Sequence, residues 1–440
     1  MSDEKDLEAR LRGYLARGAG QPAHEDLKTR VLATAYGGRG RWVPQVLAAA
    51  AVVLLAVGVG FAFQNLRAQR AVGPIGGGVV SPSATTQPSA ISTPTPVVTP
   101  SAPASATGAL GLSSIRMTSA TAGWATGDRD NGVYGPTSAV YRTEDSGNHW
   151  RQSSPAGAIV INAFFLNATS AWFVDASGQL YRTQDGGKTW RALPRVLVNP
   201  YDLDFIDGSH GWSIVGLGAA AGSEGVEIYR TSDGGTTWQQ VSVTMGPDGQ
   251  SSPGSLPFGC NKGALGFLNA SVGWAPGECA GGKPFFYVTR DGGKTWQQVN
   301  LPLPADIASG CDCTTAAPVF TSARDGSFLL TGPASVVYVT HDGGGSWSAK
   351  SVPTASAAGL DFVNANSGWV VDSPSGTVYF TADGGSRWSP ISAIAVVTNV
   401  PQLDFVDQTT GFAIRGPGKA PLLKTKDGGH TWQEIEPTYS

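Results

Sequence analysis

The chain has 440 residues and a formal net charge of −3, with 59 glycines, 29 prolines and 13 tryptophans. This length allows one large domain with appendages, and the abundance of glycine and tryptophan is typical of a turn-rich β protein. Residues 108–440 carry 20 Lys and Arg against 27 Asp and Glu, so no broad basic surface is available and no nucleic-acid partner is expected.

Residues 1–41 form the first segment. Leu7, Leu11 and Leu15 recur at a four-residue spacing, and a second short apolar stripe covers 27–32, which predicts two short amphipathic helices. Two helices of this length bury little surface by themselves. They are therefore either juxtamembrane segments or a docking element for a cytoplasmic partner.

Residues 42–66 form the second segment, which has 25 consecutive positions without a charge. A helix needs about 20 apolar residues to cross the hydrocarbon core of a bilayer, so the segment predicts a transmembrane signal-anchor. A secretory signal peptide is the alternative, but 41 preceding residues are too many for its basic leader. Four basic residues precede the span closely and two follow it, which predicts a single-pass protein with a cytoplasmic N-terminus.

Residues 67–109 form the third segment. Positions 71–109 hold 7 Pro, 6 Ser and 6 Thr and no charge. Such a composition cannot build a core and favours extended polyproline II, so an extracytoplasmic stalk is expected here.

Residues 110–440 carry seven copies of the pattern Thr-x-Asp-x-Gly-x-x-Trp, four of them with Thr before the Trp, and their aspartates lie 40, 48, 58, 51, 41 and 44 residues apart. The aspartates are Asp145, Asp185, Asp233, Asp291, Asp342, Asp383 and Asp427. The tryptophans are Trp150, Trp190, Trp238, Trp296, Trp347, Trp388 and Trp432. Strand-built repeats of roughly 40–50 residues are typical of propeller blades.

A second signature precedes each copy, a small residue followed directly or after one position by an aromatic residue. It occurs at Gly123–Trp124, Ala171–Trp172, Gly211–Trp212, Gly273–Trp274, Gly326–Phe328, Gly368–Trp369 and Gly411–Phe412. In the second copy, 159–165, 171–174, 179–183 and 189–193 are typical of four strands with short turns. The two periodic features predict an all-β, seven-bladed propeller of four-stranded antiparallel blades, each contiguous in sequence, with no strand shared between the termini.

The turn pattern resembles the Asp box, or BNR repeat, of sialidases, sortilin-type propellers, some endoglucanases and photosystem II assembly factors of the Ycf48/HCF136 kind. The resemblance spans about 330 residues. It implies a propeller, and its assembly-factor branch implies a scaffold for a membrane complex. A group that recurs in every blade suits a structural turn better than catalysis, and one carboxylate per turn is too few for a strong calcium site. No metal and no cofactor are therefore expected.

Four cysteines, Cys260, Cys279, Cys311 and Cys313, all follow the predicted span. An even number in an oxidising compartment predicts two disulfides, with zinc as the alternative. Three pairings can be drawn. A Cys311–Cys313 bond would close a very small ring, so bonds that join this pair to Cys260 and Cys279 are favoured.

Antiparallel blades place the Asp-box turns on one face of the propeller. The links between blades and the loops between second and third strands lie on the other face, which we call the loop face. The longest loops, 126–137, 216–225, 243–262 and 301–317, belong to the loop face, where recognition is expected. The candidate binding residues there are Arg129, Tyr134, Tyr201, Lys283, Arg415 and Lys419.

An enzyme is the main alternative to a binding protein. A sialidase needs an arginine cluster, whereas Arg116 has no evident companions in the sequence. A glycosidase needs two carboxylates, for which Glu224, Glu278, Asp306 and Asp372 are candidates. No Gly-x-Ser-x-Gly, HExxH or phosphate-loop motif occurs. The sequence therefore favours a non-catalytic scaffold for a protein or glycan, with a glycoside hydrolase as alternative.

The arrangement of a helical segment, one membrane span and an external domain also resembles membrane-bound anti-sigma factors of bacteria. This resemblance covers about 40 residues and implies a transmembrane sensor in a bacterial plasma membrane. The zinc-binding signature of one branch is absent, because His24 is the only histidine in 1–41 and no cysteine accompanies it.

Overall fold

The computed structural model describes residues 97–98, 108–129, 138–195, 197, 200–220, 222–245, 249–279, 284–305, 307, 310–395, 402–415 and 420–439. All of them belong to the compact unit Val59–Ser440. The predicted segments 1–41 and 42–66 lie outside the described residues. Within the described ranges every regular element is a β-strand, and no helix there is long and apolar enough to cross a bilayer.

The strands follow one order around each Asp-box turn, and we name each repeat by the aspartate of its turn. The first strands are β3 (Gly111–Met117), β7 (Val160–Phe165), β11 (Pro200–Phe205), β16 (Gly266–Phe267), β21 (Val319–Phe320), β25 (Ala357–Phe362) and β29 (Gln402–Phe405). The second strands are β4 (Gly123–Asp128), β8 (Ala171–Asp175), β12 (Gly211–Ala220), β17 (Gly273–Cys279), β22 (Gly326–Thr331), β26 (Gly368–Asp372) and β30 (Gly411–Ile414).

The third strands are β5 (Ala139–Thr143), β9 (Leu180–Thr183), β13 (Ser223–Thr231), β18 (Phe286–Thr289), β23 (Val336–Thr340), β27 (Thr377–Thr381) and β31 (Leu422–Thr425). The fourth strands are β6 (His149–Gln152), β10 (Trp190–Ala192), β14 (Gln239–Thr244), β19 (Gln297–Gln298), β24 (Ser348–Ser351), β28 (Ser389–Ala393) and β32 (Gln433–Ile435). Within a repeat the neighbouring strands pair antiparallel, as predicted for the Asp185 repeat from 159–193.

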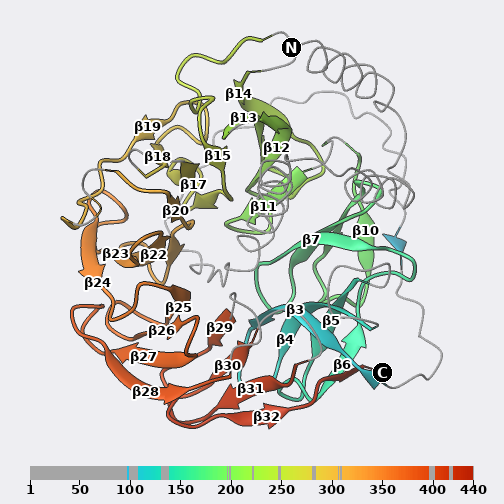
Figure 1. Ribbon diagram of the computed structural model, residues 1–440. Helices are drawn as coiled ribbons and strands as arrows, with labels where there is room; N and C mark the ends of the chain where they lie inside the picture. Colours follow the sequence, from blue (N-terminus) through green and yellow to red (C-terminus); the bar gives the residue numbers. More distant parts are fainter. Residues whose placement is uncertain are drawn as a thin grey trace, which may run out of the picture. The chain divides into compact units, whose positions relative to one another are not determined.

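Neighbouring repeats contact each other through β4 with β7 and β22 with β25, and through their first strands where β7 meets β11, β11 meets β16, and β25 meets β29. The last of them, β29, contacts β3 of the first repeat, so the series of sheets closes on itself (Figure 1). Successive antiparallel sheets that meet through their first strands and return to the start form a β-propeller.

The core lies between neighbouring sheets. Trp172 of the second strand β8 stacks on Phe205 of the next first strand, with ring centroids 3.8 Å apart. Trp212 and Phe267 repeat this contact at 3.7 Å, and so do Trp369 and Phe405. Each pair is buried, so a stacked aromatic contact joins one repeat to the next.

The C-terminus corrects one prediction. β33 (Thr438–Tyr439) leaves the Asp427 repeat and pairs in parallel with β6 of the Asp145 repeat (Figure 1). It also pairs antiparallel with β2 (Gly108–Ala109). The four main strands of each repeat are contiguous, but the prediction that the termini share no strand is wrong, because β6 leaves an outer edge that the last residues complete.

Part of the predicted stalk also pairs with the propeller. β1 (Val97–Val98) lies antiparallel to β10, opposite Trp190 and Arg191. Valine favours strands, and the outer strand of a sheet offers unpaired backbone groups. The pairings of β1 with β10 and of β2 with β33 could not be predicted from the composition of 67–109, because proline, serine and threonine dominate that segment.

Candidate functional site

The Asp-box turns close on themselves through hydrogen bonds, as the Asp342 turn illustrates. The Thr340 hydroxyl donates to Asp342 Oδ1 at 2.7 Å and accepts the Gly344 N–H at 2.9 Å. The Ser346 N–H donates to Oδ1 and the Ser346 hydroxyl to Oδ2, at 2.9 and 2.7 Å. These bonds, the Ser346 N–H first, lower the pKa of Asp342 to about 2.

Two successive residues in each turn adopt positive φ angles. Gly343 and Gly344 have φ of 72° and 79°, which explains the paired glycines of the motif. The first turn has Ser146 at φ 68° in place of a glycine.

The turns also receive hydrogen bonds from the preceding repeat. The Trp212 indole N–H donates to the Gly292 carbonyl at 3.0 Å, and Trp172 and Trp369 bond equivalent glycines. Asp145, Asp185, Asp233, Asp291, Asp342 and Asp427 accept hydrogen bonds on both carboxylate oxygens inside the turn, and Asp383 accepts them on Oδ1, so these carboxylates stabilise the turns that join the repeats.

A set of buried acceptors on the first strands was missed in the sequence. Asp204 accepts the Phe267 N–H at 2.6 Å, and Asp361 accepts the Phe405 N–H at 2.6 Å. Asp404 accepts the Met117 N–H and pairs with Arg116 at 3.2 Å, which joins the last repeat to the first. The repeated Leu-Asp-Phe at 203–205, 360–362 and 403–405 was the available signal.

Two of the candidate glycosidase carboxylates, Glu224 and Asp372, have protein partners. Glu224 accepts the Lys262 N–H at 2.7 Å, and Asp372 accepts the hydroxyls of Thr354 and Ser375. Glu278 lies on β17 and is half-buried, and Asp306 lies outside the described residues. Among the described ranges, no three His, Cys, Asp or Glu side chains gather as a metal-binding group.

The predicted loop 216–225 is instead an extended hairpin. β12 and β13 stay paired as far as Ala220 and Ser223, with a register shift between Gly216 and Gly218. The tip of the hairpin binds the link that follows the Asp233 repeat, through Glu224 N–H to Phe258 O at 3.0 Å and Cys260 N–H to Gly222 O at 2.8 Å.

Lys262 fastens this link from the inside. It belongs to β15 (Asn261–Lys262), and its ammonium donates to the carbonyls of Glu224, Phe258 and Cys260 at 2.6, 2.9 and 3.0 Å. Burial lowers the pKa of Lys262 to about 8, against the opposing effect of the Glu224 carboxylate. A buried ammonium thus replaces the hydrogen bonds that water would supply to the turn.

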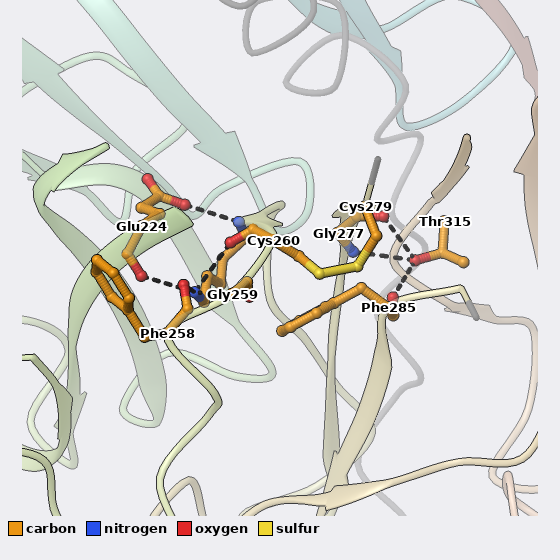
Figure 2. The surroundings of a disulfide bond; sticks show 9 residues. Glu224, Phe258, Gly259, Cys260, Gly277, Cys279, Phe285 and Thr315 are labelled. Carbon is orange, nitrogen blue, oxygen red and sulfur yellow. Dashed lines mark hydrogen bonds between the residues drawn. A yellow bond between two sulfur atoms is a disulfide. The ribbon is translucent and has the colours of Figure 1, made fainter. Parts of the chain in front are cut away.

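The disulfides correct the favoured pairing. Cys260 bonds Cys279 (Figure 2), and Cys311 bonds Cys313, so the predicted two disulfides are present but their partners differ. Cys260 lies opposite Cys279 because Asn261 pairs with Glu278, and their Cα atoms are 4.6 Å apart. The small ring forms because the chain bends at Asp312 and brings the Cys311 and Cys313 Cα atoms to 5.1 Å, within the usual range.

The loop face carries exposed apolar side chains. In the described part of the chain, the large hydrophobic residues that are exposed are Ile161, Leu217, Met245 and Phe258. Their places along the strands put all four on the loop face, and three of them surround the β12–β13 hairpin. A Cβ built on Gly225 would lie 3.4 Å from Leu217 Cβ and 3.1 Å from Met245 O, while Phe258 adjoins Glu224. We call Leu217, Met245 and Phe258 the apolar rim.

The predicted binding residues are not gathered at this rim where the structure describes them. Arg129 donates to the Tyr141 hydroxyl at 3.3 Å and lies over the Tyr439 ring at 4.8 Å. Arg415 pairs with Glu434 at 2.9 Å. Tyr201 belongs to β11, and Tyr134, Lys283 and Lys419 lie outside the described residues.

A cavity between the Asp342 and Asp383 repeats is too small for a ligand. It has about 30 Å³ and is lined by residues of β21, β22 and β25, including Phe328 and Asp361. This volume suits one or two waters, whereas ligand pockets are typically about 300–1,000 Å³.

Comparison with known proteins gives a match to the BNR/Asp-box repeat over residues 287–298, the Asp291 turn. The comparison with curated proteins gives no match. The fold is similar to the solved structure of YCF48 bound to D1 peptide, with 16% identity, coverage of 79% of this chain and 97% of that one, and a TM-score of 0.41. The fold is also similar to the solved structure of YCF48 from Cyanidioschyzon merolae, with 16% identity, coverage of 75% of this chain and 98% of that one, and a TM-score of 0.46.

A GH74 xyloglucanase from Xanthomonas campestris is also similar, with 13% identity, coverage of 79% of this chain and a TM-score of 0.46. This chain spans 55% of the length of that enzyme. The strand order, the closed series of sheets and the matched Asp-box turn define the class of the described residues, a β-propeller with Asp-box turns.

Proposed function

We propose that residues 110–440 are a seven-bladed, non-catalytic scaffold that binds a protein partner on the loop face. The apolar rim carries this proposal. Exposed large apolar residues that gather around one hairpin are typical of interaction sites, whereas isolated ones need no explanation. The rim stands on a hairpin and a link fixed by Lys262 and by a disulfide, so its backbone is held in place before a partner arrives.

The seven-blade count is part of the same proposal. Its support is the recurrence of one strand order around every Asp-box turn, and the contact of β29 with β3 that leaves no gap in the series.

We further propose that 42–66 anchors the chain in a bacterial plasma membrane, with 1–41 in the cytoplasm and the propeller outside. This rests on the uncharged run and on the basic residues before it.

The binding proposal is tested with the full chain and a displayed library of random peptides. We expect enriched peptides to carry apolar residues, and their binding to fall at least tenfold in Leu217→Asp and Phe258→Asp. Thr236→Asp, on an exposed Asp-box turn, is the matched control and should bind as the parent does. A library with no enriched peptide, or binding unaffected by both rim variants, would contradict the proposal.

A hydrolase assay tests the non-catalytic part. The full chain is incubated with xyloglucan, mixed-linkage β-glucan and a sialoside, and released reducing sugar or sialic acid is measured. We expect no release above a denatured control. Turnover that is abolished by Glu224→Gln or Asp372→Asn would replace the scaffold with an enzyme.

A further inference from the structure

Three cysteines lie in one row across adjacent strands. Cys260 is opposite Cys279, because β15 and β17 pair Asn261 with Glu278. On the other side of β17, Cys279 is the direct partner of Cys313 on β20 (Cys313–Thr315). Directly opposed residues of antiparallel strands project to the same face, with Cα atoms about 4.5 or 5.5 Å apart, and both spacings suit a disulfide.

Cys279 therefore has two neighbours that it can bond, and it is bonded to one of them. The other neighbour, Cys313, is bonded to Cys311 (Figure 2 shows the Cys260–Cys279 side). The two disulfides differ in access, because Cys260 and Cys279 are half-buried while Cys311 and Cys313 are 5% and 0% exposed. A reagent from solution meets the Cys260–Cys279 bond first.

The backbone of Cys260 adopts an unfavourable conformation. Its φ is 70°, in the left-handed region that residues with a side chain rarely adopt. Release of Cys260 from Cys279 removes the covalent restraint on this residue.

We propose that Cys260 is a thiol-modification site for low-molecular-weight thiols, and that its modification passes through Cys279 to the buried Cys311–Cys313 bond. In the first step a thiolate attacks Cys260 Sγ, which forms a mixed disulfide at Cys260 and expels the Cys279 thiolate. In the second step the Cys279 thiolate attacks Cys313 Sγ, which forms Cys279–Cys313 and expels the Cys311 thiolate. The added thiolate is consumed and the Cys311 thiolate is formed. The protein still holds two disulfides, the mixed disulfide at Cys260 and Cys279–Cys313, so no oxidant is needed.

The consequence falls on the loop face. The first step breaks the covalent bond between the 258–260 turn and β17, so hydrogen bonds alone then hold Phe258 of the apolar rim on its C-terminal side. A thiol in solution thereby alters the surface to which the scaffold function is assigned, and the exchange itself stands whether or not that function is correct.

The exchange is tested by treating the full chain with glutathione, quenching with acid, labelling with N-ethylmaleimide and mapping the peptides by mass spectrometry. We expect glutathione on Cys260, N-ethylmaleimide on Cys311 and a Cys279–Cys313 link. Cleavage between Cys311 and Cys313 at Asp312 in the spectrum distinguishes the two positions. N-ethylmaleimide on Cys279 with Cys311–Cys313 intact would overturn the proposal, and so would an unmodified protein.

Two single variants test the relay without added thiol. In Cys260→Ser we expect Cys279 to displace Cys311, so most of the N-ethylmaleimide label lies on Cys311. In the matched control Cys279→Ser, Cys260 has no neighbour to attack and should carry the label, with Cys311–Cys313 intact. N-ethylmaleimide on Cys279 in Cys260→Ser would overturn the proposed attack of Cys279 on Cys313. Tryptophan fluorescence reports whether each variant is folded. If Cys260→Ser does not fold, the glutathione map of the parent chain decides.

Discussion

Each Asp-box carboxylate is bonded within its own turn, and the bonds have a consequence for acid stability. A group whose folded pKa is depressed stabilises the protein above its unfolded pKa, and the contribution is lost as pH falls through the folded value. For Asp342 the window runs from 3.8 down to about 2.

Asp342→Asn removes the titrating group while it keeps one acceptor oxygen. We expect the variant to be less stable than the parent at neutral pH and to converge with it between pH 3.8 and about 2. Urea unfolding followed by tryptophan fluorescence at several pH values measures this. A constant difference down to pH 2 would show that the carboxylate charge contributes nothing.

The glycine of the second-strand signature has a steric role. A Cβ on Gly211 would lie 2.4 Å from the Phe205 ring, and that ring stacks on Trp172 of the preceding repeat. We expect Gly211→Ala to displace the ring and to cost about 1–3 kcal/mol of unfolding free energy.

Gly259→Ala is the control for this substitution, because a Cβ there meets no atom within 4 Å. Denaturant midpoints of the two variants give the comparison. Equal midpoints would mean that Phe205 moves without cost and that the glycine is not needed for packing.

At the scale of elements, the link that bears Phe258 depends on Lys262. Lys262→Met keeps the aliphatic stem but removes the donors to four carbonyls, each bond contributing roughly 1 kcal/mol. We expect amide exchange at Glu224 and Cys260 to accelerate about fivefold or more per lost kcal/mol. Lys350→Met, which removes one bond to Ser386, should leave these amides unchanged.

The C-terminal strand β33 joins the last repeat to the first. Removal of Thr438–Ser440 deletes its pairing with β6 and β2, together with two Thr438 bonds to Asn148 O. We expect a loss of about 1–3 kcal/mol and faster exchange in β6. Removal of Ser440 alone should change neither. An unchanged melting temperature after the longer deletion would show that β33 does not stabilise the closed series of sheets.

Local chemistry made much of the fold predictable. The Thr, Asp, Gly and Trp of one turn bond each other within a few residues, so their spacing predicts the turn and its place between third and fourth strands. The bonds between repeats were not predictable in this way. Asp204 and Phe267 are 63 residues apart, and only the register of two sheets brings them together. Cys279 has a cysteine on each side, so spacing alone could not choose its partner.

At the scale of the whole molecule, the assignment of two faces follows from the connection of the strands. The Asp-box turns join third to fourth strands, so the apolar rim lies on the opposite face only if every repeat keeps the same strand order. The described strands keep that order, and the proposal of a binding surface depends on it.

The most direct test of this account is an experimental density map of the full chain at a resolution that traces strands. We predict seven repeats of four main strands in a closed series, with β33 beside β6 and with the apolar rim and all four cysteines on the face opposite the Asp-box turns. Six or eight repeats, or Asp-box turns on the same face as Phe258, would contradict this prediction.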